Sequence, residues 1–250
     1  MADPTPIDRS AVTDSRVQRV LSAMDGILVA HDEAAVERDF HPDFVQHNPW
    51  AKDGAAHVKE MCAFEFGVHV QRYVVQGDLV AYHGIYTAPN PLGDQPLHCV
   101  DVWRVQGEQI VEHWDALQPI PAEAVGAFLD GDGDGGAAVS PQVVAGNAAR
   151  VRGFLEGTAT DMLAGDVVWH RPGGGSAEAL QAWQSEHTVE IRRTIASGDS
   201  VLAQLDTRVG TQRKVVYAWF RLHANRIEEV WMVTQDFVPD AEAATAHPHF

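Results

Sequence analysis

Two ionisable side chains, His113 and Asp115, stand two residues apart in an apolar stretch of this sequence. In an extended strand, residues of one parity share a face, so both are expected to point the same way, together with Val111 and Leu117. Burial raises the pKa of a carboxylate and makes it a stronger base, and a neighbouring imidazole can hold or moderate it. The pair therefore predicts proton abstraction next to a carbonyl group, with Asp115 as base or acid and His113 as its partner.

Other polar side chains could complete such a site. Asp101 is a third catalytic candidate, but the face on which it lies depends on a strand register that the sequence does not give. Side chains that donate a hydrogen bond to a developing oxyanion contribute on the order of 3 kcal/mol each. The residues predicted to contact a substrate as such donors or as pocket walls are His47, Asn48, His83, Trp103 and Leu117.

Each polar candidate also has a structural interpretation. Asp115 could bond to backbone amides at a strand end, and His113 could be a core histidine that is bonded to a backbone carbonyl. Asp101 could form an ion pair with Arg104 or Arg72, because buried charges are usually paired. His83 could simply be exposed at a sheet edge. These alternatives stay open at the level of the sequence.

A metal site is the competing chemical hypothesis. His47, His83, His113, Asp101 and Asp115 are residue types that bind divalent ions, but no closely spaced histidine pair supports such a site. The run DGDGDGG at 130–136 resembles the start of a calcium loop, yet Pro141 occupies the twelfth position, where a bidentate glutamate is needed. We therefore expect an interdomain linker there, and neither a metal nor a cofactor in the protein.

The chain contains an internal repeat, which locates the candidate site in its first half. Residues 107–121 correspond to 224–238, and FVQHNP (44–49) corresponds to VVWHRP (167–172). The hydrophobic skeleton persists in the second copy, whereas the polar candidates do not. His47 is the exception, because His170 retains it, and this favours a structural role for His47. The lost groups are His113, which becomes Val230, Asp115 (Met232), Asp101 (Ala218) and His83 (Gln204).

Helices precede strands in the first half of the chain. Apolar residues at helical spacing predict a helix from Asp14 onward, and two shorter helices follow, over about 32–39 and after Gly54. Two prolines and Asn48 predict an irregular path between these shorter helices. The order predicts an α+β fold in which helices cover a curled antiparallel sheet. Its predicted strands are 69–76, 78–86, 97–105 and 109–117.

Composition excludes several classes of partner. The net charge is −17 and the chain has only three lysines, so it repels nucleic acid and anionic membrane surfaces. Cys62 and Cys99 lack metal-ligand spacing and are expected to be free thiols in a reducing cytosol. The first residues contain no apolar run typical of a signal peptide or anchor. A cytoplasmic protein with a small-molecule partner is the expectation.

The motifs FHPDFVQHNP, VVQGDLVAYH and VDVWRVQGEQIVEHWDALQPIP resemble the SnoaL-like polyketide cyclase (predicted aldol-condensation) branch of the nuclear transport factor two-like superfamily. The resemblance implies two cone-shaped α+β barrels, each a curved sheet wrapped by helices. It also implies that the two copies pair within the chain, with a homodimer as a further possibility. The predicted organisation is a SnoaL-like domain at 14–124, a linker at 125–146, a degenerate SnoaL-like domain at 147–240 and a frayed tail at 241–250.

Two functional hypotheses follow. The first is a cofactor-independent acid/base enzyme for a small or medium apolar carbonyl compound, catalysing an aldol-type cyclisation, isomerisation or dehydration in the first domain. The second is a non-catalytic module for ligand binding or dimerisation, because members of this superfamily include both enzymes and binding modules.

Overall fold

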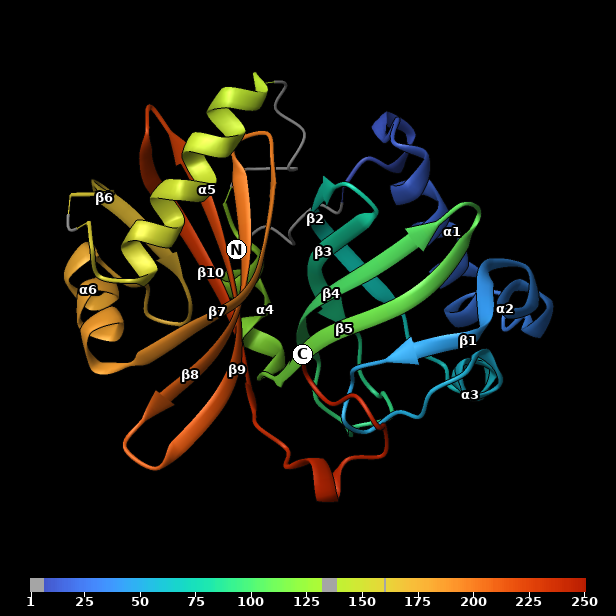
Figure 1. Ribbon diagram of the computed structural model, residues 1–250. Helices are drawn as coiled ribbons and strands as arrows, with labels where there is room; N and C mark the ends of the chain where they lie inside the picture. Colours follow the sequence, from blue (N-terminus) through green and yellow to red (C-terminus); the bar gives the residue numbers. More distant parts are fainter. Residues whose placement is uncertain (1–6, 132–138, 160) are drawn as a thin grey trace. The chain divides into compact units, whose positions relative to one another are not determined.

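A computed structural model describes residues 7–131, 139–159 and 161–250 (Figure 1). The described residues divide into two compact units. The first unit contains residues 7–122 together with Val238–Phe250, and the second contains Glu123–Phe237. Each unit has its own hydrophobic core. The centre of the predicted Gly/Asp-rich linker, 132–138, lies outside the described residues.

The first unit is built on a five-stranded sheet with the order β1-β5-β4-β3-β2. Strands β2 to β5 form an antiparallel meander, as the sequence predicts. Two of its hairpins turn at Gly77 and Gly107, whose φ angles of 61° and 60° favour glycine. The strands are β1 (Phe40–Gln46), β2 (Val68–Gln76), β3 (Leu79–Tyr86), β4 (Leu97–Gln106) and β5 (Gln109–Pro119).

The sheet is mixed rather than wholly antiparallel, because β1 pairs in parallel with β5. The sequence predicts an irregular path here, and its prolines and Asn48 obscure a strand. The structure accommodates Pro42 through an irregularity in the pairing, since the register shifts between Phe40 and Val45. Consequently Gln46 lies beside His113 at the end of β1, which brings the following loop over β5.

Helices cover one side of this sheet (Figure 1). Helix α1 buries an apolar stripe that includes Val17, Val20, Leu21 and Met24, and the side chain of Asp14 caps its first turn. The segment after Gly54 is a single α-turn that continues as a 3-10 helix. The helical elements of the first unit are η1 (Arg9–Ala11), α1 (Ser15–Leu28), α2 (Glu33–Asp39), α3 (Ala55–Val58), η2 (Lys59–Ala63) and, near the C-terminus, η4 (Asp240–Glu242).

The second unit repeats this topology, with the strand order β6-β10-β9-β8-β7 and β6 parallel to β10. Its strands are β6 (Leu163–His170), β7 (Thr188–Ser197), β8 (Ser200–Val209), β9 (Gln212–His223) and β10 (Arg226–Asp236). Its helices are η3 (Ala122–Ala124) at the boundary, α4 (Val125–Leu129), α5 (Pro141–Leu155) and α6 (Ala177–Glu186). The internal repeat is therefore a repeat of folded domains.

The C-terminal residues return to the first unit after the second unit is complete. Thr245 is buried there, and its hydroxyl bonds to the carbonyl oxygen of Gln46 at 2.6 Å. The sequence predicts a frayed tail for this segment, whereas the structure gives it ordered contacts. We call Val238–Phe250 the C-terminal strap.

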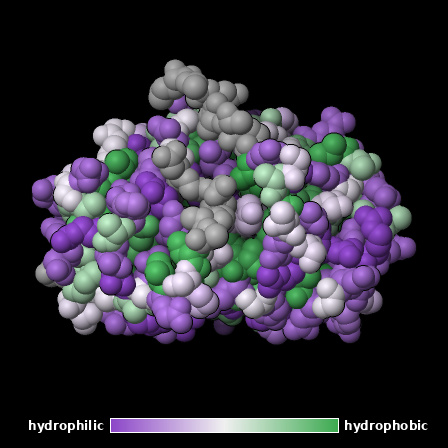
Figure 2. Space-filling model, turned by 90° about the horizontal axis from the view of Figure 1, so that it is seen from above, coloured by the Kyte–Doolittle hydropathy of each residue, from purple (hydrophilic) through white to green (hydrophobic). Residues whose placement is uncertain are grey.

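Hydrophilic residues are spread widely over the face of the molecule that Figure 2 shows. Among the described residues, no helix is long and apolar enough to cross a membrane. Cys62 and Cys99 are both free thiols, as the sequence predicts.

Candidate active site

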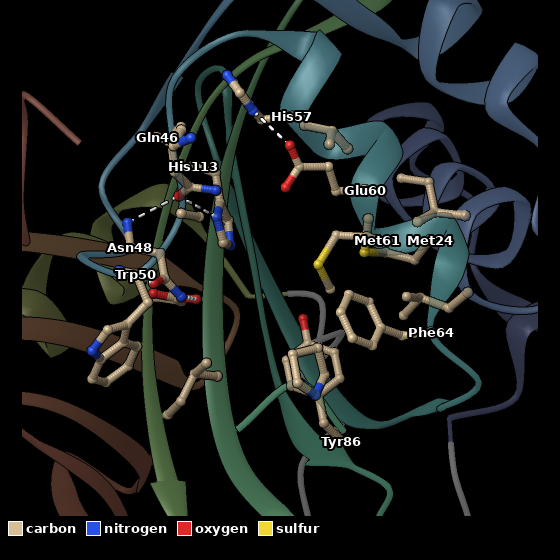
Figure 3. A pocket seen from close by; sticks show the side chains of 18 of the residues that line it. Met24, Gln46, Asn48, Trp50, His57, Glu60, Met61, Phe64, Tyr86 and His113 are labelled. Carbon is tan, nitrogen blue, oxygen red and sulfur yellow. Dashed lines mark hydrogen bonds and ion pairs between the residues drawn. The ribbon is translucent and has the colours of Figure 1, made fainter. Parts of the chain in front are cut away.

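A cavity of about 450 Å³ lies in the first unit, lined by residues of α1, η2 and the sheet (Figure 3). This volume is within the range of ordinary small-molecule sites. Apolar side chains make up most of the lining, including Met24, Ile27, Phe40, Phe44, Phe66 and Leu97. Polar groups are few, so each of them can orient a ligand in otherwise apolar surroundings.

Strand register gathers the polar groups of the cavity. Asp101 on β4 lies directly opposite Asp115 on β5, and Trp103 lies opposite His113. Directly opposed residues of an antiparallel pair share one face of the sheet. The register therefore places Asp101 on the same face as His113 and Asp115, which the sequence leaves undecided.

Asp115 is the buried carboxylate at the cavity, and the residue is only 4% exposed. Asn48 donates a hydrogen bond from Nδ2 to Asp115 Oδ2 at 2.7 Å. The other oxygen, Oδ1, is buried and has no hydrogen-bond partner among the described residues. Burial raises the pKa of Asp115 to about 6, and the negative charge of Asp101 contributes to the rise, while His113 and the Asn48 hydrogen bond oppose it. The result is a base with a pKa near neutrality and one uncommitted oxygen.

His113 is fixed on three sides. Its Nδ1 lies 2.9 Å from Gln46 Oε1, its Nε2 lies 3.0 Å from Asp101 Oδ1, and its ring stacks on Trp103 with the centroids 3.8 Å apart. Gln46 Oε1 also accepts the backbone N–H of Asn48, which identifies this atom as the oxygen. His113 Nδ1 must therefore carry a proton and donate it to that oxygen.

The contact between His113 and Asp101 requires a second proton. With Nδ1 protonated, a neutral imidazole would direct the lone pair of Nε2 toward a carboxylate oxygen, which is repulsive. A proton between Nε2 and Oδ1 removes this repulsion, whether it resides on the imidazole or on the carboxyl group. The pair therefore holds one exchangeable proton next to Asp115.

Two tyrosines extend this network along β3. Tyr86 donates a hydrogen bond from its hydroxyl to Asp101 Oδ1 at 2.8 Å, and the Tyr82 hydroxyl lies 2.9 Å from that of Tyr86. Because Tyr86 donates its single hydroxyl proton to Asp101, Tyr82 must be the donor in the contact between the two tyrosine hydroxyls. Burial raises the pKa values of both phenols well above their usual range, so both remain protonated donors.

The loop after β1 positions two of these groups. Gln46 and Asn48 hold His113 and Asp115, respectively. The backbone N–H of Gln46 donates to Asp53 Oδ1 at 2.8 Å, and that of Trp50 donates to Asn48 Oδ1 at 2.8 Å. These bonds fix both the path of the loop and the orientation of the Asn48 amide.

The predicted site residues do not all reach the cavity. Asn48, Trp103, His113, Asp115 and Leu117 line it. Asp101 lies behind the lining and touches His113 rather than Arg72 or Arg104. The structure therefore unites the three residues that the sequence proposes as catalytic.

His83 lies on the opposite face of the sheet from the cavity, contrary to the sequence-based expectation. Register places Tyr82 opposite Asp101, so His83 lies opposite Val100. Its Nε2 is within hydrogen-bond distance of His98, and its Nδ1 is within hydrogen-bond distance of Arg72. Both parities of this strand are apolar in sequence, so the sequence alone could not select the face.

His47 also points away from the cavity lining. Its Nε2 lies 2.9 Å from Glu112 Oε1, and its ring stacks on Trp114 with the centroids 4.7 Å apart. In the second unit, His170 makes the same contacts with Glu229, at 3.1 Å, and with Trp231, at 4.5 Å. The arrangement persists where the polar cluster is lost, so it belongs to the fold rather than to the chemistry.

Sequence reasoning missed Gln46 and the two tyrosines. Gln46 precedes His47 in the motif on which the resemblance is based, but its side chain gives no periodic signal. The spacing of Tyr82 and Tyr86 places both on one face of a strand, which becomes informative only when that face is known to carry Asp101.

The second unit has no equivalent polar cluster among its described residues. Val230, Met232 and Ala218 occupy the positions of His113, Asp115 and Asp101, as the paired registers show. These three residues belong to a continuous hydrophobic core. The acid/base groups are therefore confined to the first unit.

Asp101, His113 and Asp115 are also close enough together to ligate a metal ion. Each offers one ligand atom, and the three atoms lie within 4.8 Å of one another. However, both ring nitrogens of His113 already engage Gln46 and Asp101, so binding a cation through Nε2 would break the contact with Asp101 Oδ1. This network is better suited to proton transfer than to ligation.

Residues 17–113 match the model of a family described as the SnoaL-like domain. No curated protein matches the chain. Similar solved structures include a provisionally assigned ketosteroid isomerase from Kribbella flavida, with 17% identity and a TM-score of 0.34, which covers 38% of this chain and 82% of the other. A provisionally assigned polyketide cyclase from Acidithiobacillus ferrooxidans has 16% identity and a TM-score of 0.38 over 43% and 91% of the two chains. A provisionally assigned SnoaL-like polyketide cyclase from Jannaschia has 18% identity and a TM-score of 0.36, and the match covers 45% of this chain and 91% of the other.

Proposed function

Residues 17–113 form a SnoaL-like domain, and we propose that its cavity is the active site of a cofactor-independent acid/base enzyme. The substrate class is a small or medium apolar compound with an acidic C–H next to a carbonyl group. One observation carries the proposal. A buried carboxylate, whose pKa burial raises to about 6 and one of whose oxygens has no hydrogen-bond partner among the described residues, lies beside a histidine that is hydrogen-bonded to a second carboxylate.

Asp115 acts as the general base in this proposal. Its Oδ1 accepts the α-proton of the substrate, while Asn48 holds Oδ2 and thereby sets the orientation of the carboxylate. A pKa of about 6 means that most of the carboxylate is ionised at pH 7 and can accept a proton. A positioned base of this kind contributes roughly 10²- to 10⁴-fold in rate.

Removal of the α-proton leaves an enolate, whose negatively charged oxygen needs hydrogen-bond donors. Trp103 lines the cavity, and its indole Nε1–H is buried without a hydrogen-bond partner among the described residues. Trp103 is the proposed electrophilic contact, because a substrate carbonyl oxygen would satisfy this donor once the surrounding side chains move to expose it. The proton that Asp115 has taken up can then return to carbon, as an isomerisation requires, or pass to an alkoxide or leaving hydroxyl, as an aldol-type cyclisation or a dehydration requires.

Exchange of α-protons in heavy water tests this function without knowledge of the full reaction. Wild-type protein is incubated with a panel of apolar ketones and β-dicarbonyl compounds, and deuterium incorporation is followed by NMR. We expect exchange with some compounds and its loss in Asp115→Asn. Binding of the same compounds, measured by ligand-observed NMR, should survive in Asp115→Asn and weaken in Leu117→Ala, which changes the cavity wall.

The alternative is a passive binding module. In that case compounds bind, binding weakens in Leu117→Ala, and no compound exchanges its α-proton. If exchange or binding appears only after a divalent metal is added, the metal hypothesis replaces the present proposal.

A further inference from the structure

The C-terminal strap lies along the loop that carries Asn48. The strap belongs to the first unit although it follows the whole second unit in the chain (Figure 1). Its hydrogen bonds fall on Gln46, at the end of β1, and on His47 and Pro49 in the loop that follows. The first unit is therefore completed by residues that lie more than a hundred positions later in the sequence.

Three hydrogen bonds join the strap to main-chain carbonyl oxygens on either side of Asn48. The Thr245 hydroxyl donates to Gln46 O at 2.6 Å, the His249 N–H donates to His47 O at 2.8 Å, and the Ala244 N–H donates to Pro49 O at 2.7 Å. The remaining carbonyl, that of Asn48, accepts the N–H of Ala51 at 3.1 Å. Every carbonyl oxygen from residue 46 to residue 49 is thus satisfied, three of the four by the strap.

Thr245 is the central residue of this contact and is 5% exposed. Its oxygen accepts the backbone N–H of His247 at 3.1 Å while its single proton goes to Gln46 O. The carboxylate of Asp53, which holds the N–H of Gln46, lies 3.2 Å from the same hydroxyl. The hydroxyl therefore bonds the strap to the carbonyl oxygen of Gln46, beside the carboxylate of Asp53 that accepts the N–H of the same residue.

The loop in turn determines where the reacting groups lie. Asn48 Nδ2 holds Asp115, and Gln46 Oε1 holds His113. Both side chains depend on the backbone of residues 46–48, in which the strap bonds to the carbonyl oxygens of Gln46 and His47. A displacement of about 1 Å in such a supporting element is enough to lower the reaction rate by a large factor.

We propose that the C-terminal strap is a positioning element of the active site and that Thr245 is its positioning residue. It acts through the loop, keeping Asn48 in hydrogen-bond contact with Asp115 and Gln46 in contact with His113. The catalytic part of this inference rests on the proposed function, whereas the coupling between Thr245 and Asp115 does not.

The test is a double-mutant cycle that is read out on Asp115 itself. The Asp115 carboxyl is titrated by carbon-13 NMR in wild type, Thr245→Val, Asn48→Ala and the double variant. The ionisable groups around Asp115 are Asp101 and His113, with the thiol of Cys99 and the phenols of Tyr82 and Tyr86 nearby, and all of them are unchanged in these variants. Asn48→Ala removes a bond that lowers the pKa of Asp115, so an upward shift is expected.

Thr245→Val should raise the pKa of Asp115 in the same direction, by about half a unit or more, because the Asn48 contact loosens. Thr245→Ser keeps the hydroxyl and should titrate like wild type. The Thr245→Val substitution should shift the pKa of Asp115 less in the Asn48→Ala background than in wild type, since part of its effect runs through the Asn48 bond. If exchange is detected, Thr245→Val should lower kcat by about tenfold with little change in KM.

Thr207→Val is the matched control, because Thr207 is buried in β8 of the other unit and its hydroxyl donates to the carbonyl oxygen of Lys214 at 3.3 Å. It should leave the titration of Asp115 unchanged. A Thr245→Val protein that melts at a lower temperature but titrates Asp115 as in wild type would overturn the proposal, since the strap would then only add stability. An additive effect of the two substitutions would also overturn it. Neither outcome depends on turnover, so failure of the proposed function is recognised separately by the absence of exchange.

Discussion

Asp115 owes its chemistry to neighbours that act on its carboxylate in opposite directions. Burial and the charge of Asp101 raise its pKa, whereas His113 and the Asn48 hydrogen bond lower it. The balance leaves the pKa at about 6 rather than at an extreme, and a base with a pKa near the working pH is the most useful one. Strand parity predicts the pairing of His113 with Asp115, but the part played by Asn48 depends on a loop conformation that no periodicity encodes.

Burying this carboxylate should destabilise the folded protein at neutral pH. The pKa of Asp115 is raised on folding from its ordinary value of 3.8 to about 6, so the folded state binds the proton more tightly than the unfolded chain does. The associated stability is fully present below pH 3.8 and is lost as the pH rises through 6. At pH values of about 7 to 8 the ionised group then costs roughly 1–3 kcal/mol.

Asp115→Asn should therefore be more stable than wild type above a pH of about 6, by roughly 1–3 kcal/mol, and the difference should shrink at lower pH. The side-chain amide introduced by this substitution can still accept the Asn48 hydrogen bond through its oxygen. Urea unfolding at several pH values measures the difference. A variant that is less stable than wild type at a pH of about 8 would contradict the claim that burial raises the pKa of Asp115 and destabilises its ionised form.

At the scale of elements, the sheet register creates the site and the loop after β1 completes it. The sequence predicts four strands of the first sheet and the helices that cover them, because their apolar periodicity is strong. It does not predict that 40–46 is a strand, because its proline is atypical of sheets. The misplacement of His83 has a related cause, since both faces of β3 are apolar and only the pairing with β4 decides between them.

His47 and His170 provide a matched pair of substitutions at this scale. Each contacts a glutamate and stacks on a tryptophan in its own unit. His47→Ala and His170→Ala should each lower the free energy of unfolding by about 1–2 kcal/mol. Only His47→Ala should also slow exchange, because only its loop carries Asn48.

Urea unfolding and the exchange assay together measure both effects. Equal slowing of exchange by the two variants would mean that activity follows overall stability, and that the loop after β1 has no special role.

At the scale of the whole molecule, one domain keeps the polar cluster and the other fills the same positions with apolar side chains. The internal repeat predicts this division, because polar residues that a fold does not need are lost while the core persists. The strap could not be foreseen in this way. Its contacts use backbone groups and one hydroxyl. The sequence of residues 241–250, AEAATAHPHF, therefore has no hydrophobic pattern that would indicate an ordered segment.

The division between domains predicts where an apolar probe binds. Xenon occupies apolar cavities without requiring specific recognition. We expect xenon-induced shifts in the methyl NMR signals of Met24 and Leu117, which line the cavity of the first unit. Met232 and Leu205, in the hydrophobic core of the second unit, should show none. Equal responses in the two units would show that the second unit retains an open pocket.

The central claim is that ionised Asp115 removes the proton, and the pH dependence of α-proton exchange tests it most directly. With the most reactive ketone of the panel, kcat/KM for exchange should rise with pH along a single limb centred at about 6 and then level off. Asp115→Asn should abolish both the exchange and the limb. Exchange that persists in Asp115→Asn with an unchanged pH profile would assign the base to another residue and contradict the account.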